Sequence, residues 1–224
     1  DWLYRWSLRQ RKRIIPPRRG RQVWVGSLPY GLDSPGQQTP SLRERLEIGE
    51  KNFVIGRIGG SDTFNDPAAR QAVLTILDRF DHVHFIAVNT EQFGVHPRLH
   101  YVEFLERKEV DSFYETCDLF LNGRIEGESF GFSIAEPLLH GKPICAPHWI
   151  RNPRMDRNHV ILLRGLGLLY INSDDLQDKI ASFVQGRRVS RDELVARVKP
   201  FSASALADRL HELSAGTEYR SLQG

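Results

Sequence analysis

The sequence alternates between short apolar segments and longer segments whose apolar residues recur at helical spacing. This alternation strongly limits the fold, because consecutive parallel strands need a long crossover connection, which is usually a helix. We therefore expect an α/β domain with a doubly wound parallel sheet. The expected strands lie within residues 52–59, 83–89, 99–105, 118–124, 143–148 and 168–172.

The segment of residues 66–80 carries clear helix signals. Asp66 can cap the first free backbone amides, and Pro67 suits the first position of a helix. Apolar residues then recur at helical spacing from Ala69 to Phe80, which predicts one face packed on the sheet. Further helices are expected at residues 107–117, 173–184, 191–198 and 204–214.

The composition excludes several classes of protein. A share of 40% hydrophobic residues is ordinary for a globular core. No run approaches the roughly 20 apolar residues of a bilayer span, and the first residues lack the apolar stretch of a secretory signal, so we expect a cytoplasmic protein. Cys117 and Cys145 have no CxxC spacing, which favours buried thiols over a zinc site or a disulfide.

The beginning of the chain is rich in positive charge. Eight Arg and Lys residues lie between positions 5 and 21, although the net charge of the whole chain is only +3. Such a cluster can bind phosphates, an anionic membrane surface or another domain, and it can equally be a solvated surface. Trp2, Tyr4 and Trp6 could stack on bases, but no recognised nucleic-acid-binding module accompanies them, so we do not expect nucleic acid as a partner.

Two parts of the chain are expected. Residues 1–30 are a basic segment and linker, and residues 31–224 form the α/β domain. The chain begins with Asp1 and its single methionine is Met155, which we interpret as the sign of a fragment or a processed chain. Residues 1–30 would then be the tail of something upstream.

Two carboxylates, Glu128 and Glu136, follow the strand expected at residues 118–124. A helix should begin near Ser133, because Pro137 is tolerated only near a helix start. The backbone amides at residues 131 to 135 would then point out of the helix end and offer an anion site. The two acids are about 12 Å apart if the segment is helical, close to the length of a sugar diphosphate.

The same residues allow a purely structural interpretation. Ser133 and Glu136 have the spacing of a capping box, in which the serine caps the helix and the glutamate reaches back to its amide. Glu128 would then be an ordinary loop acid. The spacing alone does not decide between a capping box and a ligand site.

Glu128, the sequence SFGFSIA, Glu136 and the sequence PLLHGKPICA together resemble a block of the family four retaining glycosyltransferases of GT-B fold. Further matches follow in the right order in LPYGLD (28–33), FVIGRIGG (53–60) and VKPFSASALADRL (198–210). The resemblance covers about residues 24 to 214. It implies a single Rossmann-like domain, the C-terminal, nucleotide-sugar-binding half of such an enzyme, with the acceptor-binding half missing upstream.

The resemblance also implies roles for individual residues. Glu136 would bind the ribose of the donor, Glu128 the hydroxyls of the transferred sugar, and Arg57 the departing phosphate, which makes Glu128 and Arg57 the catalytic residues. The base would lie near Phe104 and Leu105. The remaining donor-binding positions are Gly59, Gly60, Ser129, Phe130, Gly131, Phe132 and Ser133.

Two positions depart from the family pattern. Asp62 stands where family members have a lysine that binds phosphate. The pattern therefore does not say which residue would stabilise the leaving group. Lys142 or Arg124 could replace that lysine. Ser129 stands where family members have a glycine, in the loop that carries the first acid.

The expected reaction is the retaining transfer of a sugar from a nucleoside diphosphate sugar to a hydroxyl of a glycan or a small molecule. No metal and no cofactor are expected, because the sequence has no Asp-x-Asp cluster near a strand end and the catalysis would be electrostatic. This chain alone should bind the donor and transfer little. The alternative is a module that binds a nucleotide or a partner without catalysis, which Asp62 favours. A dinucleotide-dependent dehydrogenase is excluded, because GRIGGSD lacks the GxGxxG spacing.

Overall fold

The computed structural model describes residues 42–128, 131–151 and 158–214. The chain divides into two units, of which residues 32–200 form the larger, and residues 1–31 with 201–224 the smaller. The boundary predicted between residues 30 and 31 lies outside the described residues and stays a prediction.

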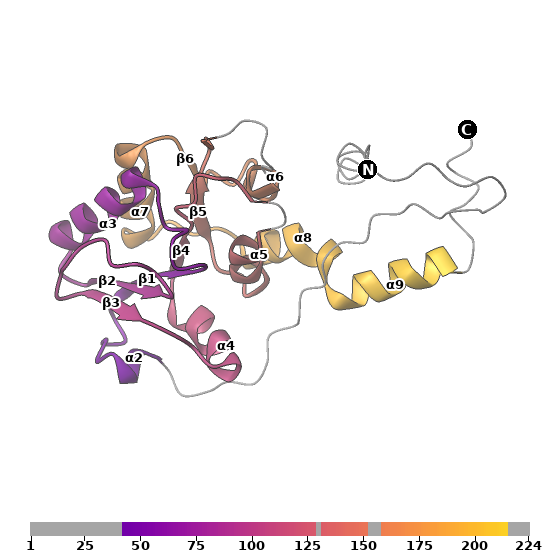
Figure 1. The fold of residues 1–224 in the computed structure, drawn as a ribbon, viewed down its shortest axis with the longest axis horizontal. Coiled ribbons are helices and arrows are strands. Elements are labelled where there is room, and N and C mark those ends of the chain that lie inside the picture. Colours follow the sequence, from indigo (N-terminus) through magenta and orange to yellow (C-terminus); the bar gives the residue numbers. More distant parts are fainter. Residues whose placement is uncertain (1–41, 129–130, 152–157, 215–224) are drawn as a thin grey trace. The chain divides into compact units, whose positions relative to one another are not determined.

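Six parallel strands of the larger unit form one sheet in the order β3-β2-β1-β4-β5-β6 (Figure 1). This order reverses direction between β1 and β4 and is that of a doubly wound, Rossmann-like sheet, which confirms the predicted fold class. Every observed strand lies within a segment that the sequence predicts. The strands are β1 (Phe53–Ile58), β2 (Val83–Val88), β3 (Leu99–Val102), β4 (Leu119–Leu121), β5 (Ile144–Pro147) and β6 (Leu169–Tyr170).

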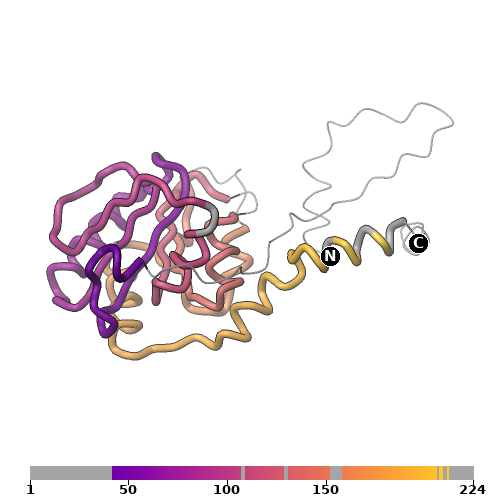
Figure 2. The backbone as a smooth tube through the Cα atoms, turned by 90° about the horizontal axis from the view of Figure 1, so that it is seen from below, coloured from indigo at the N-terminus to yellow at the C-terminus, as the bar shows by residue number. Residues whose placement is uncertain are grey.

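Helices lie on both faces of this sheet. Figure 1 shows α3 and α7 on one face and α4 and α5 on the other. Residues 185–190 then lead the chain from α7 to α8, which packs against α5 (Figure 2). The helices of this unit are α2 (Leu42–Arg45), α3 (Pro67–Arg79), α4 (Arg107–Thr116), α5 (Phe132–Leu139), α6 (Asn158–Leu163), α7 (Ser173–Val184) and α8 (Arg191–Val198). The sequence analysis did not predict α2 and α6.

Helix α3 forms for the reasons that its sequence suggests. The Asp66 carboxylate accepts a hydrogen bond from the Ala68 amide, and Pro67 occupies the first turn. One face of the helix, from Ala69 to Leu77, is fully buried. The capping and the burial of this face fix the position of α3 against the sheet.

Close packing around β1 brings α4 and β4 against the strand. A side chain at Gly56 would come within 2.6 Å of Cys117 Sγ and 2.7 Å of the Phe120 ring, so only glycine fits there. Cys117 and Cys145 are both buried and free, as predicted. The tight fit at Gly56, within β1, fixes the strand against its neighbours, and with it the position of the next residue, Arg57.

The described part of the smaller unit begins at Phe201, the last residue of the short 3-10 helix η1 (Lys199–Phe201), and contains α9 (Ala203–Ser214). Ser202 caps α9, because its hydroxyl accepts a hydrogen bond from the Ala205 amide at 3.2 Å. Across the described residues, no helix has the length and apolar character needed to cross a membrane.

Candidate functional site at the carboxyl ends of β1 and β4

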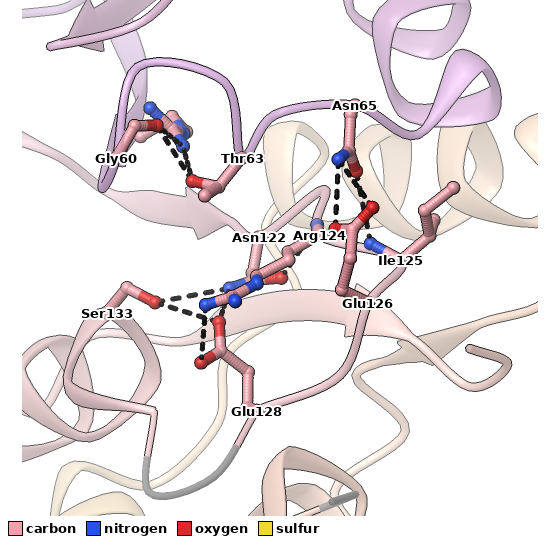
Figure 3. A network of polar contacts seen from close by, with 10 residues as sticks. Gly60, Thr63, Asn65, Asn122, Arg124, Ile125, Glu126, Glu128 and Ser133 are labelled. Atoms are coloured by element: carbon pink, nitrogen blue, oxygen red, sulfur yellow. Dashed lines mark hydrogen bonds and ion pairs between the residues drawn. The ribbon is translucent and has the colours of Figure 1, made fainter. Parts of the chain in front are cut away.

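The loops that follow β1 and β4 lie side by side at the point where the strand order reverses. In open α/β sheets, ligands bind in the crevice beyond the carboxyl ends of the strands at such a point. Asn65 joins the two loops, because its amide donates to both oxygens of Glu126 and its carbonyl accepts from the Ile125 amide (Figure 3). A small pocket there is lined by Arg57 and Ser133, among others, and has a cavity volume of about 10 Å³, room for about one water molecule.

Glu128 lies in this region and is only 6% exposed. Its Oε1 accepts hydrogen bonds from Asn122 Nδ2 at 3.1 Å and from Ser133 Oγ at 3.5 Å, and its Oε2 lies 3.5 Å from an Arg124 nitrogen (Figure 3). Burial raises the pKa of Glu128, whereas Arg124 and the hydrogen bonds from Asn122 and Ser133 act to lower it. An ionised carboxylate accepts up to about four hydrogen bonds, so Glu128 retains capacity for a further donor.

Glu136 lies one turn into α5 and is half-buried. Its Oε2 accepts a hydrogen bond of 2.5 Å from the hydroxyl of Tyr114 on α4. The capping box considered above is wrong, because α5 begins at Phe132 with Gly131 as its cap and Ser133 turns toward Glu128 instead. The glutamate side chain is therefore not used to close the helix end.

The start of α5 depends on Gly131. Its φ is 80°, in the left-handed region that favours glycine. Its carbonyl accepts hydrogen bonds from the amides of Ile134 and Ala135, each at 2.9 Å, so these two amides are not open to an anion as the sequence analysis expected. Phe132 is 42% exposed at the helix start. Ser129 and Phe130 lie outside the described residues.

Arg57 is the penultimate residue of β1 and is only 4% exposed. One terminal nitrogen donates to the carbonyls of residues 88 and 89 and to Thr90 Oγ1, and the other donates to Gly60 O and Thr63 Oγ1. The guanidinium thus joins the loop after β1 to the loop after β2. Burial lowers the pKa of Arg57 to about 10, with Asp62 acting in the opposite direction, so the side chain stays charged at pH 7. Its role toward a phosphate stays a prediction.

Lys142 and Arg124 were the two candidates for the missing lysine. The candidate Lys142 is wrong, because it lies two residues before the start of β5 and so at the amino edge of the sheet, where its Nζ binds Glu115. Arg124 lies at the carboxyl edge beside Glu128. Its Nε is buried and has no hydrogen-bond partner, although 38% of the side chain is exposed. Arg124 therefore has an unused donor next to the first acid.

The other predicted positions differ in what they expose. Phe104 is 76% exposed and Leu105 is 5% exposed, so only the first offers a side-chain surface to a base. The carbonyl of Gly59 accepts from Asn89 Nδ2, and that of Gly60 accepts from the backbone and hydroxyl of Thr63 as well as from Arg57. These two carbonyls stabilise the loop, and the donor-binding role of the two glycines stays a prediction.

Two residues that hold the acids, Asn122 and Tyr114, are not among those predicted from the sequence. Asn122 directly follows the buried strand β4, and its amide donates to both Glu128 and Ser133. A polar residue at that place in an otherwise apolar run was the available signal. Tyr114 gave a weaker one, since a tyrosine on a buried helix face needs a partner for its hydroxyl. Among the described residues, no three His, Cys, Asp or Glu side chains form a group that could hold a metal ion.

Comparison with known proteins places the fold among the GT-B glycosyltransferases. No protein-family model and no curated protein matches the sequence. Among solved structures, HepE of Anabaena, crystallised with UDP and glucose, superposes with a TM-score of 0.61 at 19% identity, over 78% of this chain and 50% of HepE. WaaG, a glycosyltransferase involved in lipopolysaccharide biosynthesis, gives 0.60 at 14% identity, over 83% of this chain and 55% of WaaG.

A third structure is matched over its whole length. The C-terminal domain of LpcC from Francisella tularensis, a group 1 glycosyl transferase, superposes with a TM-score of 0.56 at 14% identity, over 77% of this chain and 100% of that domain. The chain thus spans about half the length of HepE and WaaG and the whole of an isolated C-terminal domain. Its fold is that of the C-terminal domain of a GT-B glycosyltransferase, as predicted.

Proposed function

We propose that the chain is the donor-binding half of a glycosyltransferase that moves a sugar from a nucleoside diphosphate sugar to an acceptor hydroxyl with retention of configuration. The observation that carries this proposal is the pair Glu128 and Glu136. The first is buried at the reversal between β1 and β4, and the second lies one turn into the adjacent helix. Neither carboxylate serves to cap that helix, so both are available to hydroxyl groups.

In the proposed mechanism the protein stabilises charge. Glu136 binds the ribose, and Glu128 binds hydroxyls of the transferred sugar as positive charge develops on its ring. The start of α5 and the guanidinium of Arg124 face the diphosphate, whose negative charge grows as it leaves. The acceptor hydroxyl then attacks the anomeric carbon from the face that the diphosphate leaves, and its proton passes to an oxygen of the departing diphosphate. In this scheme the cationic groups of the protein take the place of a metal ion.

The partners of the chain follow from the same proposal. A second domain, absent from this chain, would bind the acceptor, which is a glycan or a small molecule. Residues 1–30 would connect to that domain, and their positive charge could also contact an anionic membrane surface. Because the acceptor groove lies in the second domain, the 224-residue chain should bind a donor and transfer little sugar.

Calorimetric titration tests the proposal. UDP, GDP, ADP and their common sugar conjugates are titrated into the chain and into Glu136→Gln, with Glu91→Gln as a control for the loss of one carboxylate. We expect micromolar binding of one nucleotide, weakened about tenfold in Glu136→Gln, about 1.4 kcal/mol, and unchanged in the control. Absence of binding by every nucleotide would contradict the proposal.

A second candidate is a module that binds a nucleotide without catalysis. Asp62 favours it, because an acid replaces a cation expected near the departing phosphate. Reconstituting the chain with an acceptor-binding domain separates the two candidates. Binding without sugar transfer in that assembly, together with transfer after Asp62→Lys, would identify a domain that has lost its catalytic cation.

A further inference from the structure

Tyr114 makes a single well-defined contact with the second acid. Its hydroxyl donates to Glu136 Oε2 at 2.5 Å, from helix α4 to helix α5. In this contact the tyrosine hydroxyl donates and the carboxyl oxygen accepts. Hydrogen bonds to charged groups are among the strongest in proteins, and their directionality fixes the rotation of the carboxylate.

The ring of Tyr114 is held rigidly. It is 1% exposed and lies with its centroid 5.4 Å from that of Phe120 and 4.7 Å from that of His140. His140 is fixed in turn, because one ring nitrogen lies 3.3 Å from an Asp111 oxygen and the other 3.1 Å from a Glu115 oxygen. The rigid ring of Tyr114 therefore holds its hydroxyl against one oxygen of Glu136.

This orientation leaves the carboxylate open for a diol. Tyr114 takes one acceptor position on Oε2, so Oε1 and the remaining position on Oε2 are available to two further hydroxyls. Adjacent hydroxyls on a ring present two donors side by side, which matches the two oxygens of a carboxylate. Resting on the proposed function, we infer that Tyr114 is a positioning residue that orients Glu136 for the 2′- and 3′-hydroxyls of the donor ribose and so makes the site selective for ribonucleotides.

The inference separates a positioning role from a packing role. A tyrosine that only fills space would act through its ring, and Tyr114→Phe keeps the ring. Loss of the hydroxyl frees the Glu136 side chain to rotate, so binding a ribose must then also fix that side chain. The loss of affinity should be larger for ligands that use both hydroxyls, because a ligand without the 2′-hydroxyl makes fewer bonds to the carboxylate.

The test compares ribonucleotides with deoxyribonucleotides. UDP, GDP and ADP are first titrated into the chain by calorimetry, and the one that binds is then compared with its 2′-deoxy analogue in the wild type and in Tyr114→Phe. We expect the wild type to prefer the ribonucleotide about tenfold, about 1.4 kcal/mol, and Tyr114→Phe to reduce that preference to about threefold. Tyr101→Phe is the matched control, because its hydroxyl binds loop residues 93 and 94 and not a carboxylate.

A second variant and a double variant complete the test. Glu136→Asp keeps the charge but withdraws the carboxylate from Tyr114, so it should also lose the ribose preference. In Glu136→Gln, adding Tyr114→Phe should change the preference no further, because both substitutions act on one interaction. A ribose preference that survives in Tyr114→Phe would overturn the inference and leave the proposed function intact. Failure of the wild-type chain to bind any of the three nucleotides would overturn both.

Discussion

The hydroxyl of Tyr170 donates a hydrogen bond to Asp66 Oδ2 across 2.7 Å, although 104 residues separate the two in the chain. The other oxygen of Asp66 accepts from the Ala68 amide at the start of α3, and the aspartate is fully buried. Burial and the carboxylate raise the pKa of Tyr170 well above its ordinary value, so the hydroxyl stays protonated and donates. One carboxylate thus caps a helix and holds the last strand of the sheet.

We expect Tyr170→Phe to lower the free energy of unfolding by about 2 kcal/mol, since hydrogen bonds to charged groups contribute about that much. Asp66 keeps its bond from Ala68, so the domain should still fold. Urea unfolding at pH 7 measures the change. A loss below about 0.5 kcal/mol would mean that water replaces the hydroxyl at this place.

Arg57→Lys should destabilise the loops after β1 and β2. A guanidinium donates to both loops at once, whereas one ammonium group cannot reach the same set of oxygens. We expect a loss of about 2 kcal/mol in unfolding free energy and faster proteolysis within residues 58–65 and 88–96. Arg79→Lys, on the exposed end of α3, is the control. Equal stability of the two variants would show that the loops do not depend on the hydrogen bonds of the Arg57 guanidinium.

Arg124→Gln should weaken nucleoside diphosphate binding about tenfold at low salt, about 1.4 kcal/mol, because it removes the positive charge beside Glu128. The difference from the wild type should shrink as ionic strength rises, since screening weakens the attraction. Calorimetry at two salt concentrations gives both values. Arg151→Gln removes an exposed charge that pairs with Glu126 and should have little effect. Equal losses in the two variants would argue against a specific role for Arg124.

Glu128→Gln should make the protein more stable at pH 7. Because the pKa of Glu128 is raised in the folded state, the carboxylate binds its proton more tightly there than in the unfolded chain. The ionised form therefore costs stability as the pH rises through the folded pKa, and this cost is absent below the ordinary glutamate range, about pH 4. Urea unfolding at pH 7 and pH 4 should show the gain at the higher pH alone. A gain at both values would point to another cause.

The same variant should bind nucleotide sugars less well than the wild type, while its affinity for the free nucleotide stays nearly the same. Glutamine offers one acceptor oxygen in place of two. Affinity should therefore be lost only for ligands that carry the sugar. A residue that costs stability and is needed for binding is typical of a functional site.

Much of the fold could be predicted because its signals are local. Asp66 and Pro67 predict the start of α3, and every strand falls in an apolar run. Helix α6 could not be predicted in the same way, because its six residues are too short for a periodic pattern. The side of the sheet on which Lys142 lies could have been predicted, since a residue just before a parallel strand lies at its amino end and cannot reach a site at the carboxyl ends.

The contacts of the site were harder to predict than its location. The resemblance leads to Glu128 and Glu136 through their spacing, but the partners that orient them come from β4 and α4 and meet them only in the folded chain. The Arg57 guanidinium joins two loops through bonds to backbone carbonyl groups. No sequence pattern reveals such bonds, because every residue has a carbonyl group.

The clamp formed by Arg57 has a consequence for the motions of the domain. Because one buried guanidinium binds carbonyl groups of two loops, neither loop can open without breaking bonds to the other. We therefore expect the two loops to behave as one cooperative unit in hydrogen exchange, with a shared opening free energy. A ligand that binds beyond the carboxyl ends of the strands would therefore meet two loops that open together.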